Sequence, residues 1–152
     1  KIGWLVEQTE RLTGLDHFGV YLTALFEADM LFGNEDRHLN NIAVLRRGEV
    51  FDYCPMFDFG AGLLSNVRDY AMDAEPKALL SQLRAQPMNA QFVRQIHAAQ
   101  ANYGAQIRYD SSREDIVNAL AEPLAFYAER DRSYISDRVM FCIQTQYRKL
   151  KK

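Results

Sequence analysis

Residues 32–60 read FGNEDRHLNNIAVLRRGEVFDYCPMFDFG and contain two polar loops separated by a predicted β-hairpin. Residues 42–45 and 50–53 are short and rich in residues that favour β-strands. Gly48 lies between them and is able to adopt a positive φ, as a tight connection requires. We therefore predict a hairpin that fixes how the first polar loop faces the second.

The rest of the chain has the apolar spacing of helices, with hydrophobic residues recurring every three or four positions. The pair Gly33-Asn34 suits the turn that ends the first of these helices. The predicted helices cover residues 15–32, 75–86, 88–104, 113–121 and 133–150. We predict a mainly α fold, with residues 1–152 forming a single domain that carries one small hairpin.

Local signals predict where one of these helices begins and ends. Ser111 and Glu114 have the spacing of a capping box, which would open the helix that follows. Pro123 is expected to lie near a break or restart of that helix, because proline lacks the N–H that a helix interior needs.

Composition excludes several classes of protein. The net charge of −2 argues against a nucleic-acid or polyanion binder. No apolar run approaches the roughly 20 residues needed to cross a bilayer, so no membrane role is predicted. Cys54 and Cys142 lie too far apart for a metal-binding spacing, and we expect reduced thiols in a cytoplasmic protein.

The two polar loops contain the side chains that phosphoryl transfer requires. Four residues separate Asp36 from Asn41, and Asp58 lies in the Phe-Asp-Phe-Gly string of the second loop. Mg²⁺ prefers oxygen ligands from one or two side chains, together with water and phosphate oxygens. A further carboxylate close to an acceptor hydroxyl is able to take its proton. The alternative is that these residues only cap turns, which Asn and Asp favour.

The same residues resemble a known family. GNEDRHLNN at 33–41 looks like the Asn-x-Asp-x-His-x-x-Asn motif of HipA-like Ser/Thr kinases, and CPMFDFG at 54–60 is similar to their Ser-Pro-Ala-Tyr-Asp segment. The strings DRHLNN and DFG also resemble the motifs of phosphatidylinositol 3- and 4-kinases. The proline in the second string and Asn34 favour the HipA-like group. The resemblance covers roughly residues 25 to 62.

The resemblance implies a role for each matching residue. Asp36 would be the catalytic base, and Asn41 and Asp58 would hold Mg²⁺ with ATP. Asn34 and His38 occupy motif positions, and we expect His38 to bond the backbone of its own loop. The fold implied is the helical C-terminal lobe of a protein-kinase-like fold from a bacterial, cytoplasmic protein.

The resemblance also implies partners. A glycine-rich loop and a phosphate-binding lysine are expected in an N-terminal lobe that precedes Lys1, and without that lobe the chain alone should be inactive. The acceptor would be a Ser or Thr of a protein substrate. The resemblance suggests a toxin-like enzyme with an antitoxin-type regulator.

Two other functions are compatible with the motifs. A lipid or small-molecule kinase would need basic residues after residue 60, and only Arg68 precedes Lys77 there, so a protein acceptor is preferred. A catalytically silent pseudokinase or interaction module is the other alternative, although Asp36, Asn41 and Asp58 are all present.

Three residues near the loops have predicted structural roles. Asp29 lies on the apolar stripe of its helix, and we expect its carboxylate to accept hydrogen bonds from the backbone of the next loop. Phe57 and Phe59 flank Asp58 and are expected to anchor the second loop in the core.

Overall fold

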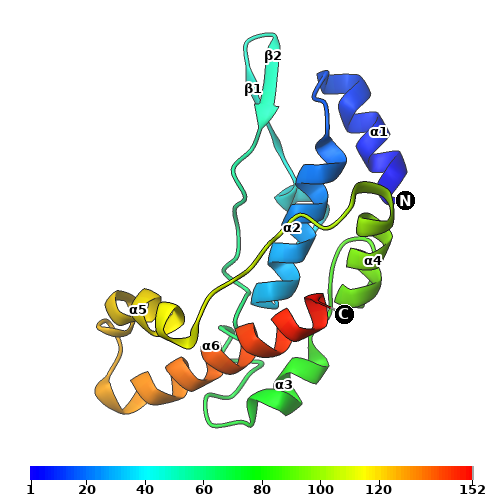
Figure 1. Cartoon of the computed structure of the whole chain (residues 1–152). Helices are drawn as coiled ribbons and strands as arrows, with labels where there is room; N and C mark the ends of the chain where they lie inside the picture. The colour runs from blue at the N-terminus through cyan, green and yellow to red at the C-terminus, as the bar shows by residue number, and fades with distance from the viewer. Residues whose placement is uncertain (152) are drawn as a thin grey trace.

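The computed structural model describes residues 1–151, which form six α-helices, one short 3₁₀ helix and a two-stranded antiparallel hairpin (Figure 1). The prediction of a mainly helical chain with one hairpin is therefore confirmed. The elements are α1 (Ile2–Thr13), α2 (Phe18–Phe32), η1 (Leu39–Asn41), β1 (Val44–Arg47), β2 (Val50–Tyr53), α3 (Pro76–Gln82), α4 (Phe92–Tyr103), α5 (Arg113–Leu124) and α6 (Glu129–Leu150).

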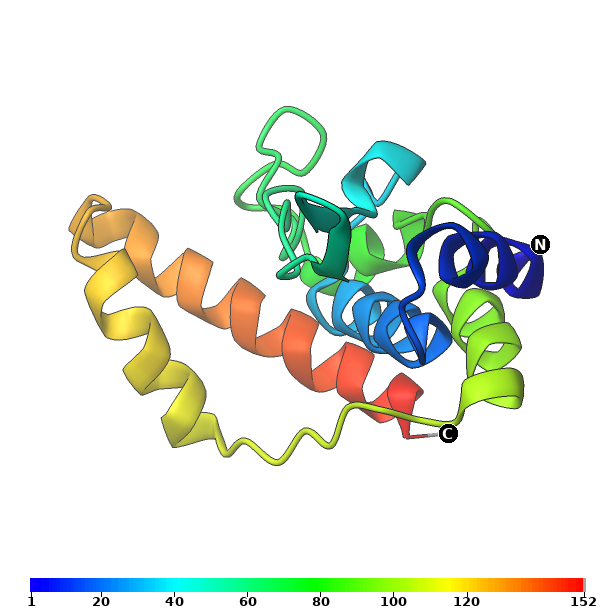
Figure 2. The ribbon, with the colours of Figure 1, turned by 90° about the horizontal axis from the view of Figure 1, so that it is seen from above.

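Helix α2 is the centre of the molecule. It lies between α1 and α4 on one side and α6 on the other (Figures 1 and 2). Phe18, Leu22, Leu25 and Phe26 belong to the main core that α2 shares with α1, α3 and α4. A second, smaller core joins Leu31 at the end of α2 to side chains of α5 and α6. A helix that is apolar on most of its faces is buried on most of them, as its sequence requires.

The first polar loop begins at a glycine turn at the end of α2. Gly33 has φ 64°, and its N–H donates to Asp29 O and Met30 O. A Cβ on this residue would lie 2.8 Å from a methyl carbon of Leu83. Both the backbone angle and the close packing therefore favour glycine here, and the prediction that the helix ends at Gly33 is confirmed.

The hairpin extends away from the helical body (Figure 1). Val44 pairs with Tyr53 and Arg47 pairs with Val50, and Gly48 adopts φ 65° in the connection. The first strand begins two residues later than predicted. Most of the hairpin is exposed, and only its base packs against the main core.

Several predicted helix boundaries are wrong. Helix α3 ends at Gln82 rather than at residue 86, and α4 begins at Phe92 rather than at residue 88. In the loop between these helices, the N–H groups of Met88 and Asn89 donate hydrogen bonds to the buried side chain of Gln95 in α4. This tertiary contact holds an irregular loop where the apolar spacing predicts helix.

The cap of α5 is displaced by one residue from its prediction. The N-cap is Ser112, and its partner in the capping box is Asp115. Pro123 lies inside the last turn of the helix, which ends one residue later at Leu124, so the prediction of a break near this proline is confirmed. Helix α6 starts at Glu129, earlier than predicted, and α1 was not predicted.

The connection from α4 to α5 is an extended segment (Figure 2). Its start is held by Glu27, an α2 residue that is 1% exposed. The Glu27 carboxylate accepts hydrogen bonds from the N–H groups of Gln106 and Ile107 and from the Gln100 side chain.

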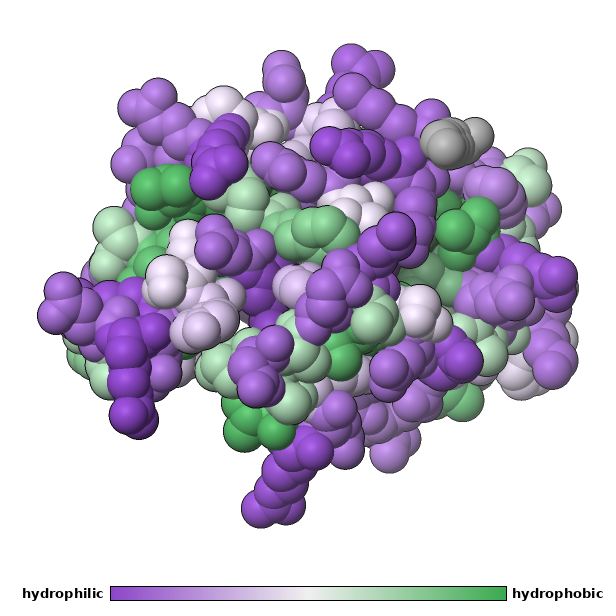
Figure 3. Space-filling model, turned by 90° about the horizontal axis from the view of Figure 1, so that it is seen from below, coloured by the Kyte–Doolittle hydropathy of each residue, from purple (hydrophilic) through white to green (hydrophobic). Residues whose placement is uncertain are grey.

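The surface is mixed in character. Seen from below, hydrophobic side chains form several separate patches between hydrophilic ones (Figure 3). Among residues 1–151, none of the helices combines the length and the apolar character needed to span a membrane.

Candidate functional site

The two polar loops meet at the side chains of Asn41 and Asp58. The Asn41 amide nitrogen donates to the Asp58 carboxylate at 2.6 Å and to the main-chain oxygen of Asp36 at 2.9 Å. Asn41 is 7% exposed, whereas Asp58 is exposed. The structure therefore brings a carboxylate and a side-chain amide, 17 residues apart in sequence, to one position at the surface.

Asp36 lies next to this pair, and its backbone is held on both sides. Its N–H donates to the Asn34 side-chain oxygen at 3.4 Å, and its carbonyl accepts from Asn41 and from the N–H of His38. The residue is exposed, and within residues 1–151 nothing donates a hydrogen bond to its carboxylate. A carboxylate without a bound donor is available to accept a proton.

Arg37 joins both loops to the core helix. Its side chain is 0% exposed, and its Nε lies 2.9 Å from Oδ2 of Asp29. Its Nη1 donates to the carbonyl oxygens of Asn41 at 2.9 Å and Phe57 at 2.8 Å, and its Nη2 reaches the carbonyl of Asp58 at 3.4 Å. One guanidinium thus binds the ends of both loops.

Asp29 is the anchor of this arrangement. Its carboxylate accepts hydrogen bonds from the side chains of Arg37 and Asn34, not from the loop backbone as predicted. The carboxylate is fully buried, and the ion pair with Arg37 offsets its charge. Burial raises the pKa of Asp29, and the Arg37 guanidinium and the Asn34 amide counteract that rise.

Asn34 links the two loops without reaching the surface. It is 0% exposed, and its amide nitrogen donates to Asp29 at 2.8 Å and to the carbonyl of Asp58 at 3.2 Å. Its side-chain oxygen accepts from the N–H of Asp36. Asn34 therefore acts through its neighbours and positions the exposed residues.

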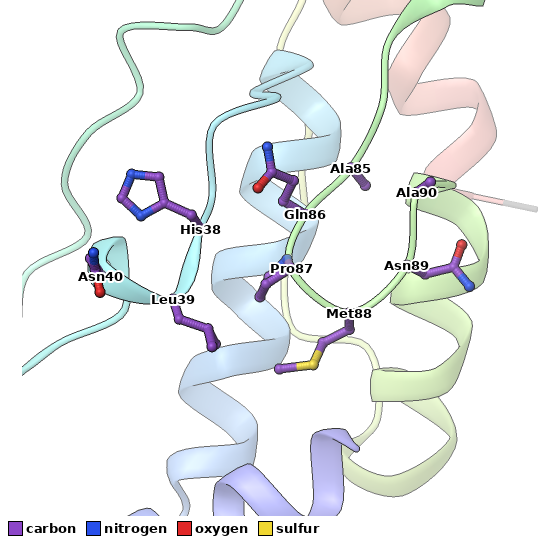
Figure 4. A pocket seen from close by; sticks show the side chains of 9 residues that line it. All are labelled: His38, Leu39, Asn40, Ala85, Gln86, Pro87, Met88, Asn89 and Ala90. Carbon is purple, nitrogen blue, oxygen red and sulfur yellow. The ribbon is translucent and has the colours of Figure 1, made fainter.

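His38 does not make the predicted hydrogen bond to its loop. Its Nδ1 is buried and has no partner within residues 1–151. His38 is one of the residues that line an open groove of about 530 Å³ between residues 38–40 and residues 85–90. Figure 4 shows these two segments on opposite sides of the groove, with Met88 extending toward Leu39. Asn40 is exposed, as predicted.

The backbone around Asp58 is unusual. Asp58, Leu63 and Leu64 have positive φ angles of 58°, 58° and 57°. Non-glycine residues rarely adopt such angles, and clusters of them are found at functional sites. Phe59 anchors the loop by packing edge-on against Phe32 at 5.8 Å between ring centroids.

The prediction for the second flanking phenylalanine is wrong. Phe57 is 39% exposed, so it does not anchor the loop in the core. Its contribution is its carbonyl oxygen, which accepts from Arg37. Of the two phenylalanines that flank Asp58, only Phe59 therefore packs against the core.

Glu35 connects the first loop to two later segments and was not singled out by the sequence. Its carboxylate accepts from the Tyr70 hydroxyl and, at 2.7 Å, from the N–H of Arg84. Its carbonyl accepts from the Gln86 side chain at 3.0 Å. Burial, and then the Glu35 carboxylate, raise the pKa of Tyr70. The segment between residues 63 and 74 is thereby tied to the site.

The side chains of Asn41 and Asp58 contain oxygen atoms of the kind that bind Mg²⁺. Asp58 offers a carboxylate and Asn41 an amide oxygen, which are ligands that this ion prefers, and the exposure of Asp58 leaves room for water and phosphate oxygens. The Asn41 nitrogen faces Asp58 in this structure, so the amide would have to turn to present its oxygen to an ion shared with Asp58. Within the part of the chain that the structure describes, no three His, Cys, Asp or Glu side chains cluster as a metal site. The amide–carboxylate pair is the candidate ligand set because its two side chains meet at 2.6 Å.

Comparison of this chain with protein-family models, with curated proteins and with solved structures finds no match. The interpretation of the site therefore depends on its residues and their geometry.

Proposed function

We propose that the chain is the C-terminal lobe of a HipA-like Ser/Thr protein kinase, which transfers the γ-phosphate of ATP to a protein hydroxyl with Mg²⁺. The observation that carries this proposal is the meeting of the Asn41 amide and the Asp58 carboxylate at 2.6 Å. The free carboxylate of Asp36 lies in the same loop and precedes Asn41 at the spacing of a kinase catalytic loop.

Each of these residues would have one role. Asn41 and Asp58 would hold the ion, and their present hydrogen bond would be exchanged for shared coordination. Bound Mg²⁺ would neutralise negative charge on the phosphates. Asp36 would orient the acceptor hydroxyl and accept its proton. The buried Arg37 would keep Asn41 and Asp58 facing each other by holding their carbonyl oxygens.

The open groove beside the first loop supports a protein acceptor. It is about 530 Å³ in volume and lies between residues 38–40 and 85–90 (Figure 4). An open groove suits an extended peptide segment, whereas small substrates are usually enclosed. An N-terminal lobe that covers the nucleotide and an antitoxin-type regulator are further parts of the proposal, and both are inferred from the family resemblance alone.

The first test is ion binding by the 152-residue chain. Mn²⁺ in place of Mg²⁺ should broaden the amide NMR signals of residues near Asn41 and Asp58, because the ion is paramagnetic. Asp58→Ala should abolish that broadening. Asp52→Ala, which removes another exposed carboxylate of the same region, should leave it unchanged. Equal broadening in the wild-type chain and Asp58→Ala would contradict the metal assignment.

The second test is phosphoryl transfer by the natural full-length protein. Asp58→Ala should reduce the transfer of labelled phosphate from ATP to a protein acceptor by about 10²-fold or more, the loss typical of removed electrostatic stabilisation. Asp52→Ala is again the control. Transfer at the wild-type rate by Asp58→Ala would refute the proposed function.

A further inference from the structure

Tyr70 connects the segment after Asp58 to the loop that carries Asp36. It is 7% exposed, and its hydroxyl donates a hydrogen bond to the carboxylate of Glu35, 35 residues earlier in the chain. The other carboxylate oxygen of Glu35 accepts from the N–H of Arg84 at 2.7 Å. Both oxygens of this carboxylate are therefore held, and each is held by a different segment of the chain.

Tyr70 is itself fixed to the body of the molecule. Its side chain belongs to the main core, and its carbonyl oxygen accepts from Arg138 of α6 at 3.2 Å. Arg138 is 4% exposed and also binds three further carbonyl oxygens within residues 64–72. Because Tyr70 is anchored through both its ring and its main chain, its hydroxyl is a fixed donor from which the more exposed Glu35 takes its position.

The peptide group that precedes Asp36 has weaker restraints of its own. Its N–H donates to the Asn34 side chain at 3.4 Å, which is long for such a bond. Its carbonyl oxygen, which belongs to Glu35, accepts from the exposed side chain of Gln86 at 3.0 Å. The Glu35 carboxylate, bonded to two donors, is therefore the main restraint on this side of Asp36.

We propose that Tyr70 is a positioning residue for the base of the proposed reaction. By holding Glu35, it fixes the main chain that orients the Asp36 carboxylate toward the acceptor hydroxyl. A misplacement of about 1 Å in a reacting group is able to lower a rate about 10²-fold, so the loss of this restraint should have a measurable effect. The inference rests on the proposed function, in which Asp36 is the base.

The first experiment needs no activity and uses the 152-residue chain. Tyr70→Phe keeps the ring and removes only the hydroxyl. The NMR order parameter of the Asp36 N–H should fall in this variant from about 0.85, typical of rigid backbone, toward the value of about 0.6 of flexible backbone. Tyr134→Phe removes the hydroxyl of an exposed tyrosine on α6 and should leave the order parameter unchanged. Equal values in the wild-type chain and Tyr70→Phe would overturn the proposal.

The same variant should keep the candidate metal site, because the carbonyl oxygens of Asn41 and Asp58 are bound by Arg37. Mn²⁺ should therefore broaden the signals near Asn41 and Asp58 equally in the wild-type chain and in Tyr70→Phe. Broadening that is lost only in Tyr70→Phe would show that the substitution disrupts the whole site, and would overturn a specific role in placing the base.

The second experiment measures kinetics in the natural full-length protein. Tyr70→Phe should lower kcat about tenfold or more and leave the KM for ATP unchanged, and Tyr134→Phe should change neither. In the Asp36→Ala background, Tyr70→Phe should have no further effect, because it acts through Asp36. A general structural effect would lower the rate by the same factor in both backgrounds, and that result would overturn the proposal.

The kinetic outcomes separate the role of Tyr70 from the proposed function. If the wild-type protein transfers phosphate and Asp58→Ala does not, but Tyr70→Phe transfers at the wild-type rate, only the role of Tyr70 is overturned. If the wild-type protein transfers none, or Asp58→Ala transfers normally, the proposed function fails, and the role of Tyr70 in catalysis fails with it.

Discussion

Replacing Arg37 with methionine should destabilise the chain by about 3–5 kcal/mol, the usual effect of removing one partner of a buried ion pair. Both Arg37 and Asp29 are 0% exposed, so the carboxylate that remains would have no access to water. The substitution would also remove the donor that binds the carbonyl oxygens of Asn41, Phe57 and Asp58. The loss is large against a typical domain stability of about 5–15 kcal/mol.

Urea unfolding followed by far-ultraviolet circular dichroism measures this effect. With a slope of about 2 kcal/mol per molar urea, the midpoint should fall by about 1.5–2.5 M. Arg46→Met is the control, because Arg46 pairs with Glu49 at 3.3 Å on the surface and should contribute less than about 1 kcal/mol. A loss below about 1 kcal/mol in Arg37→Met would refute the reasoning.

The pH dependence tests whether the buried charge is the cause. Burial already raises the pKa of Asp29, and Arg37 opposes that rise, so Arg37→Met should raise the pKa further. A carboxyl group with a higher pKa in the folded state binds its proton more tightly there, and stability falls as pH rises from the unfolded pKa toward the folded one. The destabilisation of Arg37→Met should therefore be larger at pH 7 than at pH 5. The double variant with Asp29→Asn should lose this difference, and an equal deficit at both pH values would point to lost packing instead.

Three further changes test other parts of the structure. Asp36→Ala in the natural full-length protein should reduce phosphoryl transfer by about 10²-fold or more, with unfolding free energy changed by less than about 0.5 kcal/mol because the residue is exposed; normal transfer would exclude its role as the base. In the native chain a thiol reagent should modify Cys54 much faster than Cys142, which is 1% exposed and whose pKa burial raises to about 12; equal rates would contradict that burial. Gly19→Ala should destabilise the chain by about 1–3 kcal/mol, because its Cβ would overlap a tyrosine ring of α4, whereas Gly3→Ala meets open space and should be neutral or slightly stabilising.

The helical class and the hairpin were predictable because apolar spacing and turn residues are local signals. The ends of α3 and α4 were not, because the loop between them is held by Gln95, whose partners lie up to nine residues away. The capping box at Ser112 illustrates the same limit on a smaller scale, since Ser111 and Ser112 offer the same hydroxyl and only the fold selects one.

The residues of the candidate site were predictable as a set, but the contacts that assemble them were not. Asp36, Asn41 and Asp58 have recognisable spacing, and the structure does bring Asn41 to Asp58. Arg37 gave no comparable signal, because an arginine in a polar loop is usually exposed. The available clue was Asp29, an acid on an apolar stripe, because a buried carboxylate needs hydrogen-bond donors or a cation as partners.

The hairpin was expected to set the orientation of Asn41 relative to Asp58, and the contacts assign that role mainly to Arg37. Most of the hairpin is exposed. At its tip, a Cβ added to Gly48 would have no atom within 4 Å. Arg37, in contrast, binds the main chain of both Asn41 and Asp58 and is itself fixed to α2 through Asp29. Substitutions at the tip should therefore leave ion binding at Asn41 and Asp58 unchanged, whereas loss of Arg37 should weaken it even where the chain remains folded.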